Sequence, residues 1–220
     1  MADLKPITLY GHQGAPNPWK VIIILEALKV PYKHIYIGIS EVKNEPFVSV
    51  NPNGRLPAIE DPNTGLTLWE SGAIVEYLIE TYDKEKLLTY DSFPEKYQLK
   101  QYLHFQMSGQ GPYFGQLVWF SRNHRDEVAL KRYEEQILRV YYVLDKILEG
   151  KEYLVGNKIT YADIAFIPWD TYVMENLPEF NIAEKAKAYP NYIAWYNRIQ
   201  AHPVVAKCKK LRDEAMASSK

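Results

Sequence analysis

The sequence predicts a protein of two domains, an α/β domain followed by an all-α domain. Residues 7–82 alternate short strand-like runs with helix-like runs, whereas almost every segment after residue 93 has helical spacing. A charged connector separates the two patterns, and 220 residues suffice for one large domain or two small ones. We therefore expect an α/β domain at residues 1–83, a linker at 84–92 and an all-helical domain at 93–220.

The first domain is expected to follow the order β-α-β, an irregular stretch, and then β-β-α. Short runs of β-branched, aromatic and apolar residues predict the strands, and apolar residues at helical intervals predict the helices. The last two strands flank the loop-forming sequence 61–65, which is typical of a hairpin. The expected strands are Ile7–Tyr10, Tyr32–Ile39, Leu56–Glu60 and Leu66–Trp69, and the expected helices are Pro18–Leu28 and Ser71–Tyr82.

The second domain is expected to contain long helices at residues 95–122 and 126–148. The glycine-containing run 109–115 lies inside the first of them. It is not a dinucleotide-binding fingerprint, because no strand precedes it and Phe114 occupies the last glycine position. We expect this run to bend or break the helix.

A further helix is expected to start near Thr160. Asp163 follows Thr160 by three residues, as in a capping box, and Ile159 and Ile164 occupy the positions of a hydrophobic staple. This pattern is a strong indication of a helix start.

Composition and charge exclude several classes of protein. The single cysteine, Cys208, cannot form an internal disulfide, a Cys-x-x-Cys redox pair or a cysteine-rich zinc site, and the five histidines show no metal-binding spacing. The longest aliphatic run, Val21–Leu25, is far shorter than the ~20 residues of a membrane span. A net charge of −1 does not favour nucleic acid or an anionic membrane as partner. No signal-peptide pattern is present, so we expect a cytoplasmic protein.

Three clusters of the first domain lie where strands end and helices begin, which is where α/β layouts usually bind ligands. The first cluster is Ala15–Lys20. Asn17 followed by Pro18 is typical of a helix N-cap and a first helical residue, and the pair can be only that. Alternatively, the Asn17 amide donates to an anion, such as a thiolate, held at the positive end of the helix.

The second cluster is the turn at residues 51–59. Pro57 lies between a glycine-containing turn and the start of a strand, where a cis peptide or a strand-entry proline is tolerated. The segment can be a turn and nothing more. If the Leu56–Pro57 bond is cis, the backbone of Leu56 faces outward and can pair with an extended peptide ligand.

The third cluster is Trp69–Ala73. Ser71 is a good N-cap for the following helix, and its hydroxyl suits a carboxylate. The adjacent Glu70 can accept from an ammonium group. The two side chains suit the two ends of an amino-acid head group, although a capped helix preceded by a solvated acid has the same pattern.

Taken together, these clusters resemble the cytosolic glutathione transferases, and the likeness spans nearly the whole chain. Within that family the closest likeness is to the fungal and bacterial Asn-type group, the Ure2p-like class. The resemblance implies a thioredoxin-like domain that binds glutathione, an all-helical domain that shapes the second-substrate pocket, and a homodimer. The segments that carry it are Ala15–Asn17, Phe47–Asn53, Asn51–Ala58, Trp69–Ile74, Phe105–Gly109 and Thr160–Asp163.

The resemblance also implies the contacts to glutathione. Ser71 and Glu70 would hold the γ-glutamyl head group. Leu56 would pair with the cysteinyl backbone beside a cis Pro57, and Arg55 would lie near the peptide. The glycyl carboxylate would be reached by Lys43, in a loop where the correspondence is least certain.

Asn17 stands where other classes of the family carry a catalytic serine or cysteine. An amide can donate to a thiolate but cannot attack, so glutathione itself would supply the nucleophile. Tyr10 is an alternative thiol activator, as in other classes; with 18 tyrosines in the chain, we expect it to pack at the end of the first strand.

Three aromatic residues of the helical domain are candidates for the second-substrate pocket: Phe114, Trp119 and Phe120. Aromatic residues at helical spacing are more often ordinary core. Both interpretations stay open on the sequence.

We expect a glutathione transferase of the detoxifying kind. Thiol-disulfide exchange or deglutathionylation is favoured over conjugation, on the habits of the similar group, and attack on a peroxide is a further possibility. The alternatives are a carrier of hydrophobic small molecules and a regulatory protein like the yeast relative. That relative relies on an Asn/Gln-rich N-terminal extension, and because the first strand is expected from Ile7, we favour the enzyme. With no cysteine in the first domain, every reactive sulfur would belong to a ligand.

Overall fold

The computed structural model describes residues 4–218. Met1–Asp3 belong to the N-terminal segment in which no signal-peptide pattern is found, and they lie outside the described part. Two compact units are present, and their classes confirm the α/β and all-α predictions. The boundary differs from the predicted one at the C-terminus. The described residues from His202 to Ser218 pack with the first unit, which otherwise ends at Leu87, and the second unit is Leu88–Ala201.

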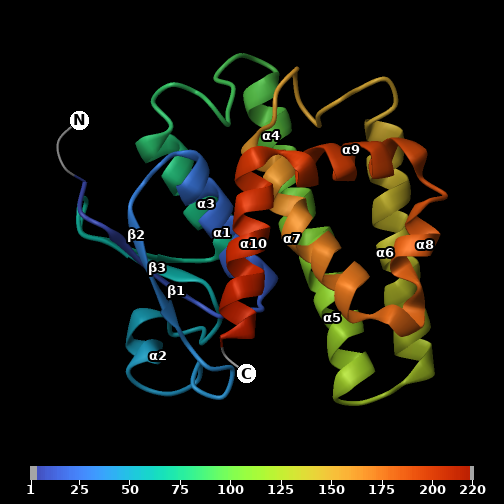
Figure 1. Cartoon of the computed structure of the whole chain (residues 1–220), viewed down its shortest axis with the longest axis horizontal. Helices are drawn as coiled ribbons and strands as arrows, with labels where there is room; N and C mark the ends of the chain where they lie inside the picture. Colours follow the sequence, from blue (N-terminus) through green and yellow to red (C-terminus); the bar gives the residue numbers. More distant parts are fainter. Residues whose placement is uncertain (1–3, 219–220) are drawn as a thin grey trace. The chain divides into compact units, whose positions relative to one another are not determined.

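A four-stranded sheet in the order β2-β1-β3-β4 forms the centre of the first unit (Figure 1). β1 runs parallel to β2 and antiparallel to β3, and β3 is antiparallel to β4. All four predicted strands are present, although β2 is shorter than predicted and β3 starts two residues later. The strands are β1 (Ile7–Gly11), β2 (Tyr32–Tyr36), β3 (Ala58–Asp61) and β4 (Leu66–Trp69).

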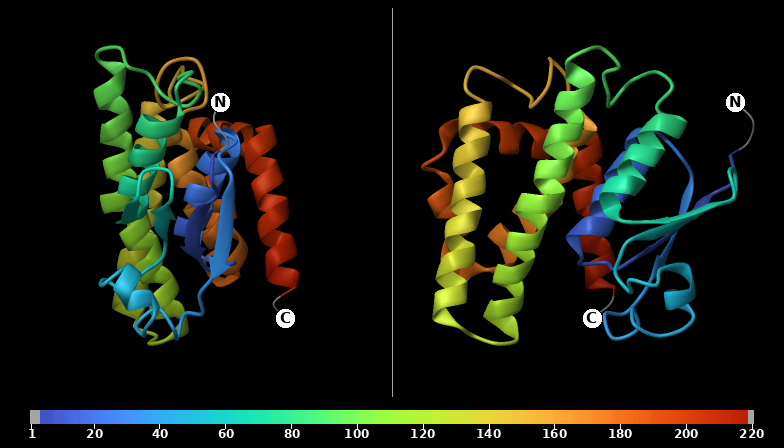
Figure 2. Two further views of the ribbon diagram at one scale, coloured as in Figure 1. Left: turned by 90° about the vertical axis from the view of Figure 1, so that its left-hand side faces the viewer. Right: turned by 180° about the vertical axis from the view of Figure 1, so that it is seen from behind.

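Helices cover the two faces of this sheet unequally. α1 (Pro16–Ala27) and α3 (Ser71–Tyr82) pack together on the face that carries the fully buried Ile7 and Leu9. α10 (Pro203–Ala217) lies alongside α1, as Figures 1 and 2 show. Its two buried side chains explain why the end of the chain returns to the first unit: Val205 and Cys208.

The opposite face carries one short helix, α2 (Phe47–Val50), in the stretch predicted to be irregular. Side chains alternate along a strand, so Tyr10 of β1 points to this face. Its ring lies 5.8 Å from that of Phe47, between centroids. One face of the sheet is therefore closed by helices and the other is left partly open.

The second unit is helical throughout its secondary structure. The predicted helix 95–122 continues through a π-helical segment, Gln106–Gln110, just before Pro112. Because Pro112 has no N–H, the regular hydrogen-bond ladder is broken there, which accounts for the irregular turn. The helices are α4 (Glu95–Phe105), α5 (Gly111–Arg122), α6 (Glu127–Ile147), α7 (Tyr161–Asn176), a 3-10 turn (Pro178–Phe180), α8 (Ile182–Ala186) and α9 (Pro190–Ala201).

The start of α7 confirms the predicted capping box. Asp163 accepts from the Thr160 N–H at 2.9 Å and from the Thr160 hydroxyl at 2.7 Å. Its other oxygen accepts from the Leu154 N–H at 2.9 Å and from the Trp195 indole N–H at 2.8 Å. This buried carboxylate ties the start of α7 to α9 and to the preceding loop.

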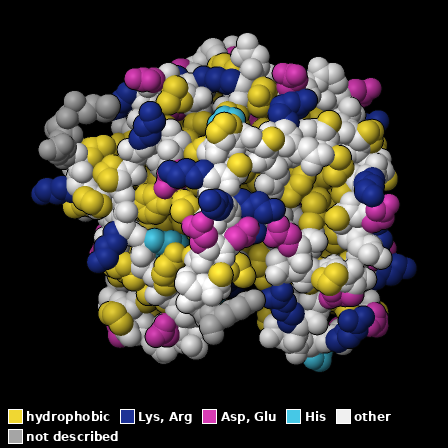
Figure 3. Space-filling view, viewed as in Figure 1, with side chains coloured by type: hydrophobic (Ala, Val, Ile, Leu, Met, Phe, Trp, Pro, Cys, Tyr) yellow, Lys and Arg dark blue, Asp and Glu magenta, His cyan; other side chains and the backbone are white. Residues whose placement is uncertain are grey.

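Charged side chains of both signs are interspersed on the face shown in Figure 3, in keeping with a net charge of −1. Over residues 4–218, none of the helices combines the length and the apolarity needed to span a membrane.

Candidate functional site

The first site element is the start of α1. The helix begins at Pro16 with Ala15 as its N-cap, so the prediction that Asn17 caps the helix is wrong. Proline favours the first helical position because its φ is fixed near the helical value, and Pro16 takes that position one residue before Asn17. Asn17 is thus the second helical residue, and it is partly exposed.

This correction changes which backbone groups an anion would meet at α1. Pro16 and Pro18 carry no N–H, so among the first three helical residues Asn17 supplies the backbone N–H. Two hydrogen bonds hold the preceding loop: the Trp19 indole N–H donates to the Gln13 carbonyl at 2.6 Å, and the Gly14 N–H donates to His12 Nδ1 at 3.1 Å. The loop that leads into α1 and Asn17 is therefore fixed.

The second site element is the junction between β4 and α3. Ser71 is the first residue of α3 and is 2% exposed, while Glu70 occupies the N-cap position with φ at 73°. The prediction that Ser71 is the N-cap is therefore wrong by one residue. The left-handed backbone of Glu70 turns the chain sharply between strand and helix, which leaves the Glu70 side chain exposed beside a buried Ser71.

Lys20, which the sequence analysis did not single out, joins these two elements. The side chain belongs to α1, is fully buried, and donates from Nζ to Ser71 Oγ at 3.1 Å. Burial lowers the pKa of Lys20 to about 7, and the nearby charge of Glu70 opposes that shift. A signal was present in the sequence: Lys20 immediately precedes the apolar run Val21–Leu25, in a helix that must be buried along most of its length.

The third site element is the turn before β3. Asn51, 1% exposed, braces it: its amide donates to the Arg55 carbonyl at 2.6 Å, and its side-chain oxygen accepts from the Asn53 N–H at 3.0 Å. The Leu56–Pro57 bond is cis, as the resemblance implies. Leu56 lies two residues before β3 and outside its strand pairings.

Lys43 lies against this same turn. Its Nζ donates to the Asn53 carbonyl at 2.8 Å, and its side chain passes so close to Gly54 that a Cβ there would lie 2.8 Å from Lys43 Cδ. Gly54 has φ at 58°, which glycine adopts readily. The loop before α2 thus brings Lys43 next to Arg55, and both cationic side chains are exposed.

Tyr10 of β1 pairs with Ala58, directly after the turn of the third element. Its hydroxyl donates to Glu60 at 2.7 Å, and burial together with that carboxylate raises the pKa of Tyr10 to about 12. A phenol held in this way is a poor activator of a thiol, in keeping with the expectation that Tyr10 packs at the strand end.

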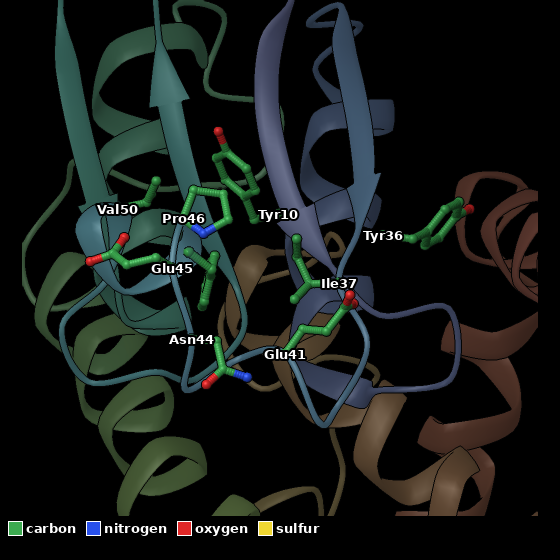
Figure 4. Close-up of a pocket in the computed structure, with 9 residues that line it drawn as sticks. Tyr10, Tyr36, Ile37, Glu41, Asn44, Glu45, Pro46 and Val50 are labelled. Atoms are coloured by element: carbon green, nitrogen blue, oxygen red, sulfur yellow. The ribbon is translucent and has the colours of Figure 1, made fainter.

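A cavity of about 400 Å³ opens next to Tyr10, on the sheet face opposite α1. Figure 4 shows Ile37 and Glu41 on one side of it and Pro46 and Val50 of the α2 segment on the other. None of the residues predicted to contact glutathione lines this cavity. It is therefore separate from the three site elements.

The three aromatic pocket candidates of the helical unit do not share one environment. Phe114 is fully buried, and its ring packs edge-on against Tyr141 at 6.0 Å, as expected of ordinary core. Trp119 is 48% exposed and contacts Phe120 edge-on at 4.9 Å, and Phe120 stacks on Tyr133. Trp119 and Phe120 form one cluster near the end of α5, and Phe114 lies apart from it.

The single thiol is not placed for chemistry. Cys208 is 1% exposed in α10, and burial raises its pKa to about 12. Within the described part of the chain, no group of three or more His, Cys, Asp or Glu side chains is arranged to hold a metal ion.

Comparison with known proteins gives the family. Residues 5–80 match the model of the glutathione S-transferase N-terminal domain, and residues 83–203 match that of the C-terminal domain. The chain is 44% identical over 212 residues to the glutathione S-transferase-like protein OpS6 of Beauveria bassiana, covering 94% of this chain and 96% of that protein. It is 33% identical over 244 residues to the transcriptional regulator URE2 of Saccharomyces cerevisiae, covering 93% of this chain and 68% of the regulator.

A solved structure supports the same assignment. The glutathione transferase URE2P6 of Phanerochaete chrysosporium, in complex with oxidised glutathione, superimposes with a TM-score of 0.90 at 39% identity. The match covers 98% of this chain and 100% of that one. These findings confirm the predicted resemblance, including its Ure2p-like character.

Proposed function

This chain belongs to the glutathione S-transferase family, and from that premise we propose that it binds glutathione in its thioredoxin-like unit and uses the bound thiolate as its nucleophile. The observation that carries the proposal is the junction of the starts of α1 and α3. Lys20 of α1 bonds to Ser71 of α3, so the turn bearing Asn17 lies next to the head-group residues Glu70 and Ser71. An anionic sulfur and an amino-acid head group would then be held by neighbouring helix starts.

The remaining contacts follow the course of an extended tripeptide. The γ-glutamyl ammonium would meet the exposed Glu70, and its carboxylate would meet Ser71. The cysteinyl backbone would pair with Leu56 in the manner of an added strand, beside Pro57. Two exposed cationic side chains, Lys43 and Arg55, would suit the glycyl end of the peptide.

Asn17 would lower the pKa of the bound thiol. Its amide, its backbone N–H and the positive end of α1 favour the thiolate over the thiol. A charge-assisted hydrogen bond is worth ~1.5–3 kcal/mol, or about one to two pKa units. A shift of that size brings a thiol with an ordinary pKa of ~8.5 into the neutral range.

The favoured reaction is thiol-disulfide exchange. With a disulfide, the bound thiolate attacks one sulfur, and the other sulfur leaves as a thiolate and takes up a proton. With a glutathionyl ketone, the thiolate attacks the thioether sulfur, the S–C bond breaks, and the carbon leaves as an enolate that takes up a proton. A second glutathione then resolves any mixed disulfide, with glutathione disulfide as the product. The structure of URE2P6 with oxidised glutathione supports this choice, because that relative accommodates the product. Peroxide reduction and conjugation to an electrophilic carbon use the same thiolate.

We also propose a cytoplasmic homodimer with a detoxifying role. Near the start of α4, Phe93 and Tyr97 are 84% and 63% exposed, with ring centroids 6.3 Å apart. An exposed aromatic pair of this kind suits a protein interface. Light scattering on the purified chain tests this part of the proposal, and a monomer at micromolar concentration contradicts it.

A binding role without catalysis is the second candidate, because a 33% identical relative is named a transcriptional regulator. The carrier form of this role would hold hydrophobic small molecules. It predicts retained glutathione binding with no turnover.

One experiment separates these functions. Steady-state rates are measured with reduced glutathione against a dialkyl disulfide, a glutathionyl ketone and a chlorinated aromatic electrophile, alongside calorimetric binding of glutathione. We expect turnover with the first two substrates to exceed turnover with the third. Binding without turnover on any of them supports the carrier, and absence of binding overturns the proposed function.

A further inference from the structure

Lys20 is a buried cation to which the proposed function has so far given no role. Lysine is almost never fully buried unless its charge is compensated, because removing an ammonium from water costs several kcal/mol. Here the side chain is fully buried, and its Nζ reaches Ser71 Oγ at 3.1 Å. An apolar residue at this position would pack without that cost, so stability alone does not explain the lysine.

We propose that Lys20 is a positioning residue of the γ-glutamyl site, which holds the ligand's carboxylate through the Ser71 hydroxyl and supplies the positive charge beneath it. The proposal rests on the glutathione-binding function argued above. Lys20 lies on the buried side of α1. The proposal therefore adds a residue of α1 to a site otherwise made by the start of α3.

The geometry of the hydroxyl gives Lys20 this role. A serine hydroxyl has one proton to donate and two lone pairs to accept with. An ammonium group can only donate, so Lys20 in its charged form occupies a lone pair of Ser71 Oγ and directs the hydroxyl proton toward a different acceptor. A carboxylate at the start of α3 is such an acceptor, and a donor polarised in this way forms a stronger hydrogen bond.

Two residues at the start of α3 act on Lys20, Glu70 through its charge and Ser71 through its hydroxyl. From α10, Lys207 is engaged with Glu26 at 2.6 Å, six residues farther along α1. β1 presents apolar side chains to this helix.

Binding of an anion next to Ser71 should therefore be coupled to protonation of Lys20. Without ligand, burial lowers the pKa of Lys20 to about 7, so much of the population is neutral just above neutrality. A carboxylate close by favours the ammonium and raises that pKa again. Ligand binding would then take up a proton in the window above about pH 7, and affinity would fall as pH rises through the raised pKa.

The test uses S-methylglutathione, whose blocked thiol removes the proton released by the cysteine. Calorimetry at about pH 7.5 in two buffers of different ionisation enthalpy measures the protons taken up. We expect uptake of about half a proton by the wild type and none by Lys20→Met, together with an affinity about 10-fold weaker in the variant. Lys33→Met, which removes an exposed lysine of β2, is the matched control and should behave as the wild type.

The outcomes separate the two proposals. No binding of S-methylglutathione to the wild type overturns the proposed function. Binding without proton uptake, uptake that persists in Lys20→Met, or an unchanged affinity of that variant overturns the role of Lys20 and leaves the function standing. Should Lys20→Met fail to fold, Lys20→Gln takes its place: it keeps a donor to Ser71 Oγ but carries no charge that titrates, so the proton uptake should be lost.

Discussion

Two helix starts, one in each unit, show how differently this chain treats a buried ionisable side chain. At the start of α7, Asp163 is fully buried and accepts four hydrogen bonds, two on each oxygen. Next to the start of α3, Lys20 of α1 is equally buried, donates to Ser71 Oγ, and lies near the charge of the exposed Glu70. At the start of α7 the protein itself supplies the hydrogen-bond partners of the buried group, and we call this the closed start. At the start of α3 the neighbouring Glu70 is exposed to solvent, and we call this the open start.

The difference indicates what each start is for. A buried polar network in which every atom is satisfied rigidifies the fold and has no capacity for a ligand. A helix start with a strained N-cap residue and a buried cation beneath it costs stability, which proteins tolerate mainly where function requires it. Substitutions at the closed start should therefore affect unfolding, and substitutions at the open start should affect binding and turnover.

The largest effect is expected from Asp163→Asn. Because each carboxylate oxygen receives two donors, either orientation of the new amide turns its NH2 toward two N–H or O–H groups. We expect a loss of about 2–4 kcal/mol in the free energy of unfolding, measured by urea denaturation, with glutathione affinity of the folded protein unchanged. Asp126→Asn is the control: Asp126 caps α6 by accepting from the Ala129 N–H at 2.8 Å, and asparagine caps equally well. Equal losses in the two variants contradict the closed-network interpretation.

The opposite behaviour is expected of Asn17→Ala at the open region. We expect turnover to fall by about 10- to 100-fold and the pKa of bound glutathione to rise by about one to two units, because one donor to the thiolate is lost. The pKa is read from thiolate absorbance during a pH titration of the complex, and stability should change by less than about 0.5 kcal/mol.

Two further variants serve as controls for Asn17→Ala. Asn17→Ser retains a donor and should recover part of the activity. Asn176→Ala removes another partly exposed helical asparagine, one that donates to the Tyr172 carbonyl at 3.0 Å, and should leave turnover unchanged. An unaltered rate and an unaltered thiol pKa in Asn17→Ala exclude the proposed role of the amide.

The sequence predicts the closed start better than the open one, for physical reasons. The capping box of Thr160 and Asp163 is a local pattern of four residues, so it can be recognised without knowledge of the fold. The contact between Lys20 and Ser71 joins residues 51 positions apart and exists only once α1 packs on α3. The start of α1 also differs from the predicted one by two residues, since Pro16 takes the first helical position ahead of Asn17.

The same contrast explains the error at the C-terminus. Helical spacing in residues 203–217 predicts a helix correctly but does not say which partner it packs on. The partner is determined by α1, whose side chains are buried along most of its length and against which α10 packs. The four strands and their flanking helices were predictable because each is defined by a local periodicity.

A smaller effect is expected in the pH dependence of stability. Lys20 has a pKa of about 7 in the folded protein against 10.5 in its ordinary state, so between these values the unfolded chain binds the proton that the folded chain releases. The free energy of unfolding should then rise with pH across this window, by at most ~1.4 kcal/mol per pH unit. Relative to Lys20→Met, the wild type should gain about 1–2 kcal/mol between pH ~7 and ~9 in urea denaturation. Lys33→Met should keep the wild-type slope, and parallel profiles of wild type and Lys20→Met contradict the depressed pKa.

The smallest effect is expected from Cys208→Ala. This thiol is enclosed by the protein, like Asp163, although it lies in the same unit as the site at the start of α3. It is buried in α10 with its pKa raised to about 12, so it stays protonated at neutral pH and inaccessible to substrate. We expect turnover within about twofold of the wild type and a stability loss of about 1 kcal/mol from the small cavity. Iodoacetamide should label the native chain at neutral pH only after urea is added. If the substitution abolishes turnover in a folded protein, a protein sulfur takes part in the reaction, and the proposal that glutathione supplies every reactive sulfur fails.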